Sequence, residues 1–134
     1  MRLSSDLGDF LDMTRVDRPS DDYDPLLLVR VAFRGLTAEV ECHVPRAAWL
    51  GFTQDLVILE TRRQGEAKVE GASPGELALV VRSLGHGGHM GVEGTVGHRS
   101  FRGEATLTFG VLEFDPWQLA GFVHGARANA AALG

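Results

Sequence analysis

Three histidines in a glycine-rich segment come closest to metal-binding chemistry. His86, His89 and His98 lie in the stretch LGHGGHMGVEGTVGH. Two histidines three residues apart could bind zinc on a helix or in a tight turn, but in an extended strand they point to opposite faces. Cys42 and His43 are adjacent, so in a strand they also point apart. The paired close ligands of zinc sites are missing, and the sequence predicts no metal site.

An acidic segment offers a second kind of chemistry. Residues 19–25, PSDDYDP, contain Asp21, Asp22 and Asp24 around Tyr23. Their spacing lacks the regularly placed oxygen ligands and the closing glutamate of an EF-hand calcium loop. We interpret the segment as a solvated acidic loop, which could also be an acidic contact for a basic partner.

The sequence offers no positive argument for catalysis. Cys42 occupies an inward position of a predicted strand, which is typical of a small core residue. No G-x-G-x-x-G motif precedes a helix, and no P-loop motif is present. The sequence therefore predicts that the protein is not an enzyme and needs no cofactor.

Charges of both signs interleave on the outward positions of the predicted strands. They are Arg30, Arg34, Lys68, Arg82 and Arg102 with Glu39, Glu41, Glu70, Glu93 and Glu104. One interpretation is a solvated sheet face stabilised by cross-strand pairs. The other is a binding surface around an apolar island, which the N-terminal strand or a second copy of the chain could instead cover. The island is formed by Leu26, Leu28, Ala32, Ala78 and Val80, and the candidate binding residues are Arg30, Glu39, Glu41, Arg82, Glu93 and Arg102, with Asp21, Asp22 and Tyr23 at the edge.

A hairpin followed by a helix is the clearest element that could position these charges. Residues 26–34 and 36–44 alternate apolar and polar side chains in matching phase. A two-residue turn at Arg34-Gly35 would pair Phe33 with Leu36 and place both apolar faces on the same side. Pro45 suits the first position of a helix, and apolar residues then recur at helical spacing as far as Leu59.

The rest of the chain adds five strands and one further helix. We expect strands over 10–16, 66–70 and 76–82, a turn at 71–75, and a second hairpin whose arms, 86–96 and 101–109, flank a loop at 97–100. Asp115 to Gln118 is typical of a helix start, because Asp115 can accept hydrogen bonds from first-turn amides and Gln118 can reach back. The order β-β-β-α-β-β-β-β-α predicts an α+β fold: one mainly antiparallel sheet of about six to seven strands with both helices packed on one face.

Length and composition limit the class of protein. The chain has 134 residues, of which 44% are hydrophobic and 23% charged, so we expect one globular domain over residues 1–134. A net charge of −5 argues against a nucleic-acid partner, and no apolar run is long enough for a membrane helix. A single cysteine and the absence of an apolar signal segment favour the cytoplasm.

Four stretches of the sequence resemble the WapI-type immunity-protein family of bacterial toxin–immunity systems. They are DDYDPLLLVRV (21–31), TAEVECHV (37–44), WLGFTQDLVILETRRQGEAKVE (49–70), and GGHMGVEGTV (87–96) followed by ATLTFGVLEFDPWQLAGFV (105–123). The resemblance implies a small cytosolic protein that blocks a toxin by occlusion. It transfers no catalytic residue, because inhibition of this kind needs none.

Two functions follow as hypotheses. The first is a non-catalytic binding protein of the immunity type, whose partner would be a protein such as a basic toxin domain; an acidic inhibitor gains association rate by electrostatic steering. The second is a small-ligand-binding or enzymatic domain with a cavity between sheet and helices. That cavity would be lined by Trp49, Phe52, Met90, Phe101, Trp117 and Phe122, which are otherwise simply core residues.

Overall fold

The fold is α+β, with antiparallel sheets and two helices. The computed structural model describes residues 1–17, 24–85, 88–100 and 102–133, and for Arg99 its backbone alone. Within these residues the strands are β1 (Arg2–Ser4), β2 (Phe10–Arg15), β3 (Leu26–Phe33), β4 (Leu36–His43), β5 (Glu66–Glu70), β6 (Leu77–Ser83), β7 (Met90–Ser100) and β8 (Gly103–Phe114), and the helices are α1 (Arg46–Arg62) and α2 (Gln118–Ala131).

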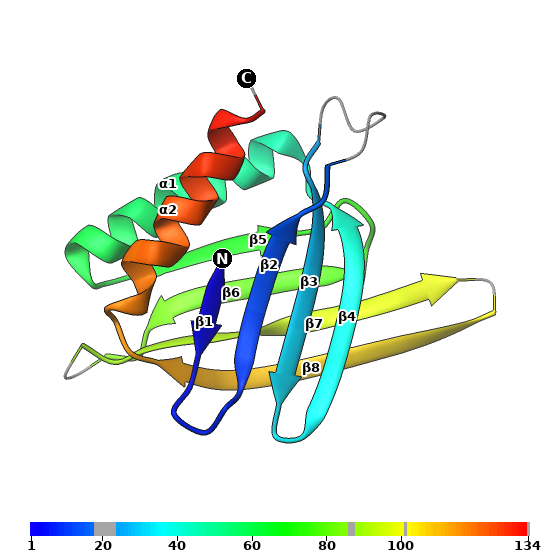
Figure 1. The fold of residues 1–134 in the computed structure, drawn as a ribbon, viewed down its shortest axis with the longest axis horizontal. Helices are drawn as coiled ribbons and strands as arrows, with labels where there is room; N and C mark the ends of the chain where they lie inside the picture. Colours follow the sequence, from blue (N-terminus) through cyan, green and yellow to red (C-terminus); the bar gives the residue numbers. More distant parts are fainter. Residues whose placement is uncertain (18–23, 86–87, 101, 134) are drawn as a thin grey trace.

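The strands form two sheets, so the expectation of a single sheet is wrong. The orders are β1-β2-β3-β4 and β5-β6-β7-β8, antiparallel throughout (Figure 1). Helix α1 follows β4 and carries the chain to the start of the second sheet. Alternation along a strand shows which of its faces is apolar but not which strand lies beside it. The alternation of apolar and polar residues therefore does not predict the number of sheets.

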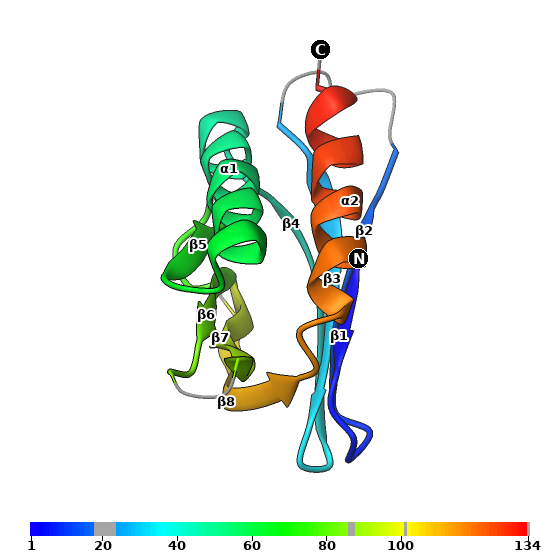
Figure 2. The same cartoon turned by 90° about the vertical axis from the view of Figure 1, so that its left-hand side faces the viewer.

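The core lies between the two sheets and the two helices. The sheets turn their apolar faces toward each other, and α1 and α2 lie side by side where the sheets are furthest apart (Figure 2). Helix α1 packs on β5, and α2 packs on β1. The largest fully buried side chains include Trp49, Phe52 and Phe122. The helices therefore close a space that two sheets alone would leave open.

The β3–β4 hairpin has the predicted turn and register. Phe33 lies opposite Leu36, and Arg34 and Gly35 have φ angles of 53° and 83°. Two positive φ angles are typical of a two-residue hairpin turn. Most inward side chains of both strands are buried, as at Val31 and Val40, whereas Leu36 next to the turn is exposed, and Cys42 is a core residue as predicted.

The β7–β8 hairpin differs from its prediction. Residues 97–100, expected to form a loop, continue β7, and Ser100 lies opposite Gly103. Phe101 lies outside the described residues. Near the base of the hairpin the register shifts between Val92 and Gly94, and a Cβ at Gly94 would lie 2.1 Å from the Ala78 carbonyl oxygen. The close approach of this backbone requires glycine, and the irregularity bends the strand.

The N-terminal strand β1 was not predicted, and its residue Ser4 forms hydrogen bonds with a residue that is far away in sequence. The Gln118 side chain accepts a hydrogen bond from the Ser4 N–H (2.8 Å) and donates one to the Ser4 carbonyl (2.8 Å). The Gln118 side chain therefore pairs with the backbone of β1 rather than with the first turn of its own helix.

The start of α2 also differs from its prediction. Asp115 accepts a hydrogen bond from the Trp117 N–H at 3.3 Å. Trp117, expected to pack in the core, is 73% exposed.

Candidate functional site

The candidate binding residues do not form one surface. Arg30, Glu39 and Glu41 lie on the outer face of the first sheet. Arg82 and Glu93 lie on the outer face of the second sheet, which points to a different side of the molecule (Figure 2). Arg102 is exposed at the tip of the β7–β8 hairpin, and Asp21, Asp22 and Tyr23 lie outside the described residues. The division follows directly from the presence of two sheets.

The apolar island is divided in the same way. Leu26, Leu28 and Ala32 belong to the first sheet, whereas Ala78 and Val80 belong to the second. Leu26 is buried at 5% exposure, and the other four are half-buried. These five residues therefore do not make a continuous exposed apolar patch.

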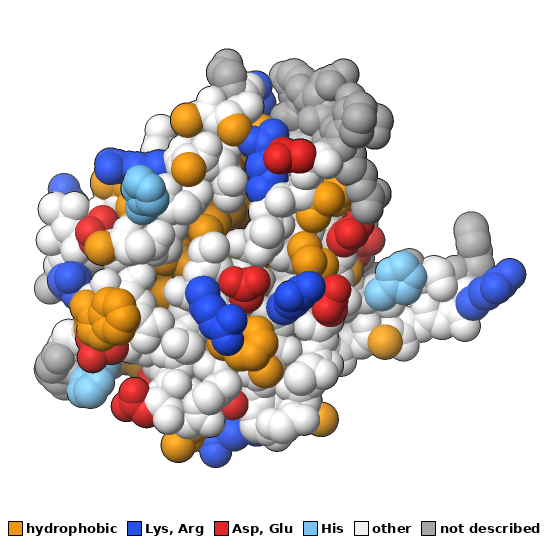
Figure 3. Space-filling model, viewed as in Figure 1, with side chains coloured by type: hydrophobic (Ala, Val, Ile, Leu, Met, Phe, Trp, Pro, Cys, Tyr) orange, Lys and Arg blue, Asp and Glu red, His pale blue; other side chains and the backbone are white. Residues whose placement is uncertain are grey.

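A row of alternating charges crosses the outer face of the first sheet. Arg2, Asp12, Arg30 and Glu39 lie opposite one another on four successive strands. The Arg30 Nε lies 3.3 Å from Glu39 Oε2, and the Arg2 guanidinium lies 4.0 Å from the centre of the Phe10 ring. Figure 3 shows basic and acidic side chains intermingled on this face. The row ends at Glu39, because β4 is an edge strand.

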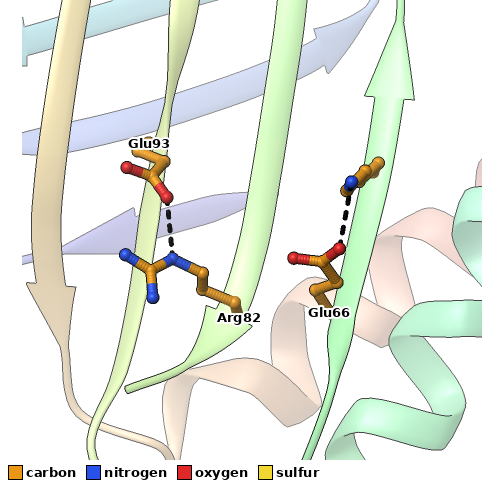
Figure 4. A network of polar contacts seen from close by, with 4 residues as sticks. Glu66, Arg82 and Glu93 are labelled. Atoms are coloured by element: carbon orange, nitrogen blue, oxygen red, sulfur yellow. Dashed lines mark hydrogen bonds and ion pairs between the residues drawn. The ribbon is translucent and has the colours of Figure 1, made fainter.

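The outer face of the second sheet is also internally paired. The Arg82 Nε donates a hydrogen bond to Glu93 Oε1 at 2.7 Å, and the Lys68 Nζ lies 3.0 Å from Glu66 Oε1 (Figure 4). The side chains of Lys68 and Glu66 are 64% and 48% exposed, so water screens their attraction. This face fits the interpretation of a solvated sheet surface.

A projecting arm is a feature that the sequence pattern did not predict. We define the arm as residues 98–106, the part of the β7–β8 hairpin beyond the end of β6. His98 lies opposite Ala105, Ser100 lies opposite Gly103, and the described side chains of the arm are exposed. The hairpin extends past the edge of the first sheet and away from the body of the molecule (Figure 1; Figure 3).

A groove separates the arm from β4. Its volume is about 380 Å³. One wall is the edge of β4 and the other is the inner face of β7 and β8. The lining residues are Leu36, Thr37, Ala38, Glu39, Val96, Gly97, His98, Ala105, Thr106 and Leu107.

The β4 wall of the groove presents backbone groups without a partner in the described part of the chain. Phe33 and Leu36 flank a two-residue turn and therefore form a hydrogen-bonded pair. Alternation then directs the N–H and C=O groups of Thr37 and Glu39 away from β3. No hydrogen bond to these groups occurs among the described residues. Further along β4, the His43 carbonyl accepts a hydrogen bond from the Ala72 N–H at 2.8 Å.

The groups considered for metal binding or nucleophilic catalysis lie in environments that do not suit that chemistry. Burial, with a smaller contribution from Glu76, raises the pKa of Cys42 to about 12, so its thiol stays protonated at neutral pH. Asp24 Oδ1 accepts a hydrogen bond from the Arg46 N–H at 2.9 Å, at the start of α1. Among the residues that the structure describes, no three His, Cys, Asp or Glu side chains could hold a metal ion.

One serine lies in a sequence that matches a catalytic motif, within the segment predicted to be a turn. Residues 71–75, GASPG, have the form G-x-S-x-G. A nucleophile elbow requires a strand–turn–helix context. Here the segment joins the antiparallel strands β5 and β6, and Ser73 is exposed. The turn interpretation is confirmed, and the elbow geometry is not present at Ser73.

The residues proposed to line a ligand cavity mostly fill the core. Trp49, Phe52, Met90 and Phe122 are at most 1% exposed. The Trp49 Nε1–H donates a hydrogen bond to the Ala126 carbonyl at 3.3 Å. Their packing joins α1, α2 and the second sheet. Phe101 lies outside the described residues.

Comparison with known proteins gives no assignment. No protein-family model, curated protein or solved structure matches the chain. Neither helix in the described part of the chain has the length and apolar character needed to cross a membrane. The arm and the groove beside it are therefore taken as the candidate site on geometry alone.

Proposed function

We propose that the chain is a non-catalytic binding protein that contacts another protein through the arm and the edge of β4. The arm is the observation that carries this proposal. A two-stranded ribbon is marginally stable in water unless something packs against it. The arm extends beyond the sheet, and those of its side chains that the structure describes are exposed, so contact with a partner would supply the packing that the body does not.

The chemistry of the described residues supports binding rather than turnover. The one cysteine has a raised pKa and is buried. The exposed ion pairs, such as that of Arg30 with Glu39, are cross-strand pairs of a kind common on sheet surfaces. A protein that acts by occlusion needs a shaped surface and no perturbed catalytic group.

The partner that we propose is a basic protein, and the setting is the cytoplasm. The net charge of −5 would increase the rate of association with a basic protein and opposes binding to nucleic acid. The resemblance to WapI-type immunity proteins makes a bacterial toxin domain the concrete form of this partner. Inhibition would then consist of covering the toxin's working surface.

A pull-down with a shortened arm tests the proposal. The tagged protein is incubated with a lysate of its own cells, and retained proteins are identified by mass spectrometry. In the variant, Asn-Gly replaces residues 99–104, so His98 and Ala105 become the pair that closes a two-residue turn. We expect the full chain to retain a basic protein and the variant to lose it. Glu70→Lys, on the edge strand β5, controls for a general effect of surface change.

Retention of no protein by the full chain, together with a small metabolite that co-purifies, would contradict the proposal. Equal retention by the full chain and the shortened variant would remove the arm from the binding surface.

A further inference from the structure

We infer that the edge of β4 at Thr37 and Glu39 accepts an extended segment of a protein partner as a fifth strand of the first sheet, with basic side chains on the outer face of that strand. The inference rests on the proposed function and names the form of the partner. Strand addition of this kind supplies affinity through main-chain hydrogen bonds and specificity through alternate side chains.

The backbone of β4 has the arrangement that strand addition needs. The N–H and C=O groups of Thr37 and Glu39 point away from β3, and both residues are exposed. A strand placed beside β4 would lie about 4.8 Å from it, at the spacing of paired strands. It would therefore lie within the groove between β4 and the arm.

The inner side of the groove specifies apolar side chains. Leu36 and Ala38 point to the inner side of β4, and Ala105 and Leu107 face them from β8. Every second side chain of an added strand would point inward between these residues. The arm continues the inner layer past the edge of β4, so an added strand would be covered on this side.

The outer side of the edge specifies positive charge. The row Arg2, Asp12, Arg30, Glu39 alternates in sign across the sheet and ends on an acidic residue. Oppositely charged residues directly across from each other stabilise a strand pair, whereas like charges destabilise it. A Lys or Arg opposite Glu39 would continue the alternation.

The same charges disfavour a second copy of this chain that pairs along the full length of β4. Two β4 strands paired antiparallel about a two-fold axis at Glu39 would place Glu39 opposite its own copy. An axis at Val40 would place Glu39 opposite Glu41. Both registers set like charges directly across from each other, which is destabilising.

Binding of designed peptides to the full chain tests the inference. The probe is a fluorescein-labelled heptapeptide, Val-Lys-Val-Lys-Val-Lys-Val, with blocked ends, and binding is measured by fluorescence anisotropy. We expect saturable binding of this peptide. We expect weaker binding of the matching Val-Glu peptide, and no binding of a Val-Lys peptide whose alternate amides are N-methylated on the edge that faces β4.

Two variants of the chain locate the site. Thr37→Pro removes an outward N–H from an edge strand, a position at which proline is tolerated, and we expect it to abolish binding. Glu39→Lys should weaken binding of the Val-Lys peptide by about tenfold, equivalent to about 1.4 kcal/mol. Glu70→Lys makes the same charge change on the edge strand of the second sheet and should leave binding unchanged.

Several results would overturn the inference. They are failure of the Val-Lys peptide to bind, equal binding of the N-methylated peptide, or equal weakening by Glu39→Lys and Glu70→Lys. Self-association of the chain that Thr37→Pro abolishes would instead identify a second copy as the occupant. If Thr37→Pro unfolds, the binding measurements with Glu39→Lys and with the N-methylated peptide still test whether the peptide pairs with β4. The lysate pull-down is a separate measurement, so loss of the proposed function and loss of this inference are distinguishable.

Discussion

The β3–β4 and β7–β8 hairpins are both closed by short turns, but they differ in what lies beneath them. The first packs on the core from end to end on one face, apart from Leu36 at its tip, which is 62% exposed. The second packs at its base and continues into the arm, where the described side chains are exposed. Burial on one face produces the alternation that reveals a strand and its register. Without burial that signal is lost, and residues 97–100, in which His98 and Ser100 are exposed, resemble a loop.

The largest expected effect sharpens the contrast within the first hairpin. Leu27→Ala removes a fully buried side chain, and we expect it to lower the free energy of unfolding by about 3 kcal/mol. Leu36→Ala is the matched control at the exposed tip, where we expect a loss of less than about 0.5 kcal/mol. Urea denaturation followed by circular dichroism measures both. Equal losses would contradict the description of the tip as lying outside the core.

A substitution at the base of the second hairpin should lower the free energy of unfolding nearly as much. Gly94→Ala would place a Cβ 2.1 Å from the Ala78 carbonyl oxygen, and the backbone of β6 would have to move. We expect a loss of about 2 kcal/mol in the free energy of unfolding, the usual size for overpacking. Gly121→Ala, where nothing lies within 4 Å of the added Cβ, is the control and should not destabilise the protein. Unchanged stability of Gly94→Ala would show that β6 and β7 are not so closely apposed.

The tip of the first hairpin has an anchor that involves a buried carboxylate. Asp9 is 9% exposed, and its Oδ1 accepts a hydrogen bond from the Arg34 N–H at 3.0 Å. Asp9→Ala removes the acceptor, and we expect a loss of about 1 to 2 kcal/mol. Asp9→Asn keeps an oxygen acceptor and should lose less. Thermal unfolding of the three proteins decides, and identical melting temperatures would show that Asp9 does not hold this turn.

The smallest effect on stability is expected at the arm. Replacement of residues 99–104 by Asn-Gly removes side chains that are exposed wherever the structure describes them. We expect the free energy of unfolding to change by less than about 0.5 kcal/mol, because little apolar area is lost from the core. Urea denaturation of the shortened protein measures the change. A loss as large as that of Leu27→Ala would mean that the arm is part of the folded core, and the proposed binding role would lose its main support.

The local elements follow from the sequence alone. Apolar residues at helical spacing after Pro45 predict α1, and the matched alternation around Arg34-Gly35 predicts the first hairpin with its register. Strand β5 was predicted with its observed bounds, Glu66–Glu70. These features depend on interactions between residues close in sequence, which periodicity and turn chemistry record directly.

The way in which these elements meet is set by the tertiary structure. It divided the strands into two sheets, separated Arg30 from Arg82, and joined Ser4 to Gln118 across most of the chain. It also left the edge of β4 open beside the arm. Pairing between strands is made by backbone groups that every residue carries, so side-chain pattern alone does not identify the neighbour. The candidate site lies at such an edge, and this is why the sequence pointed to its charges, such as Glu39, but not to its shape.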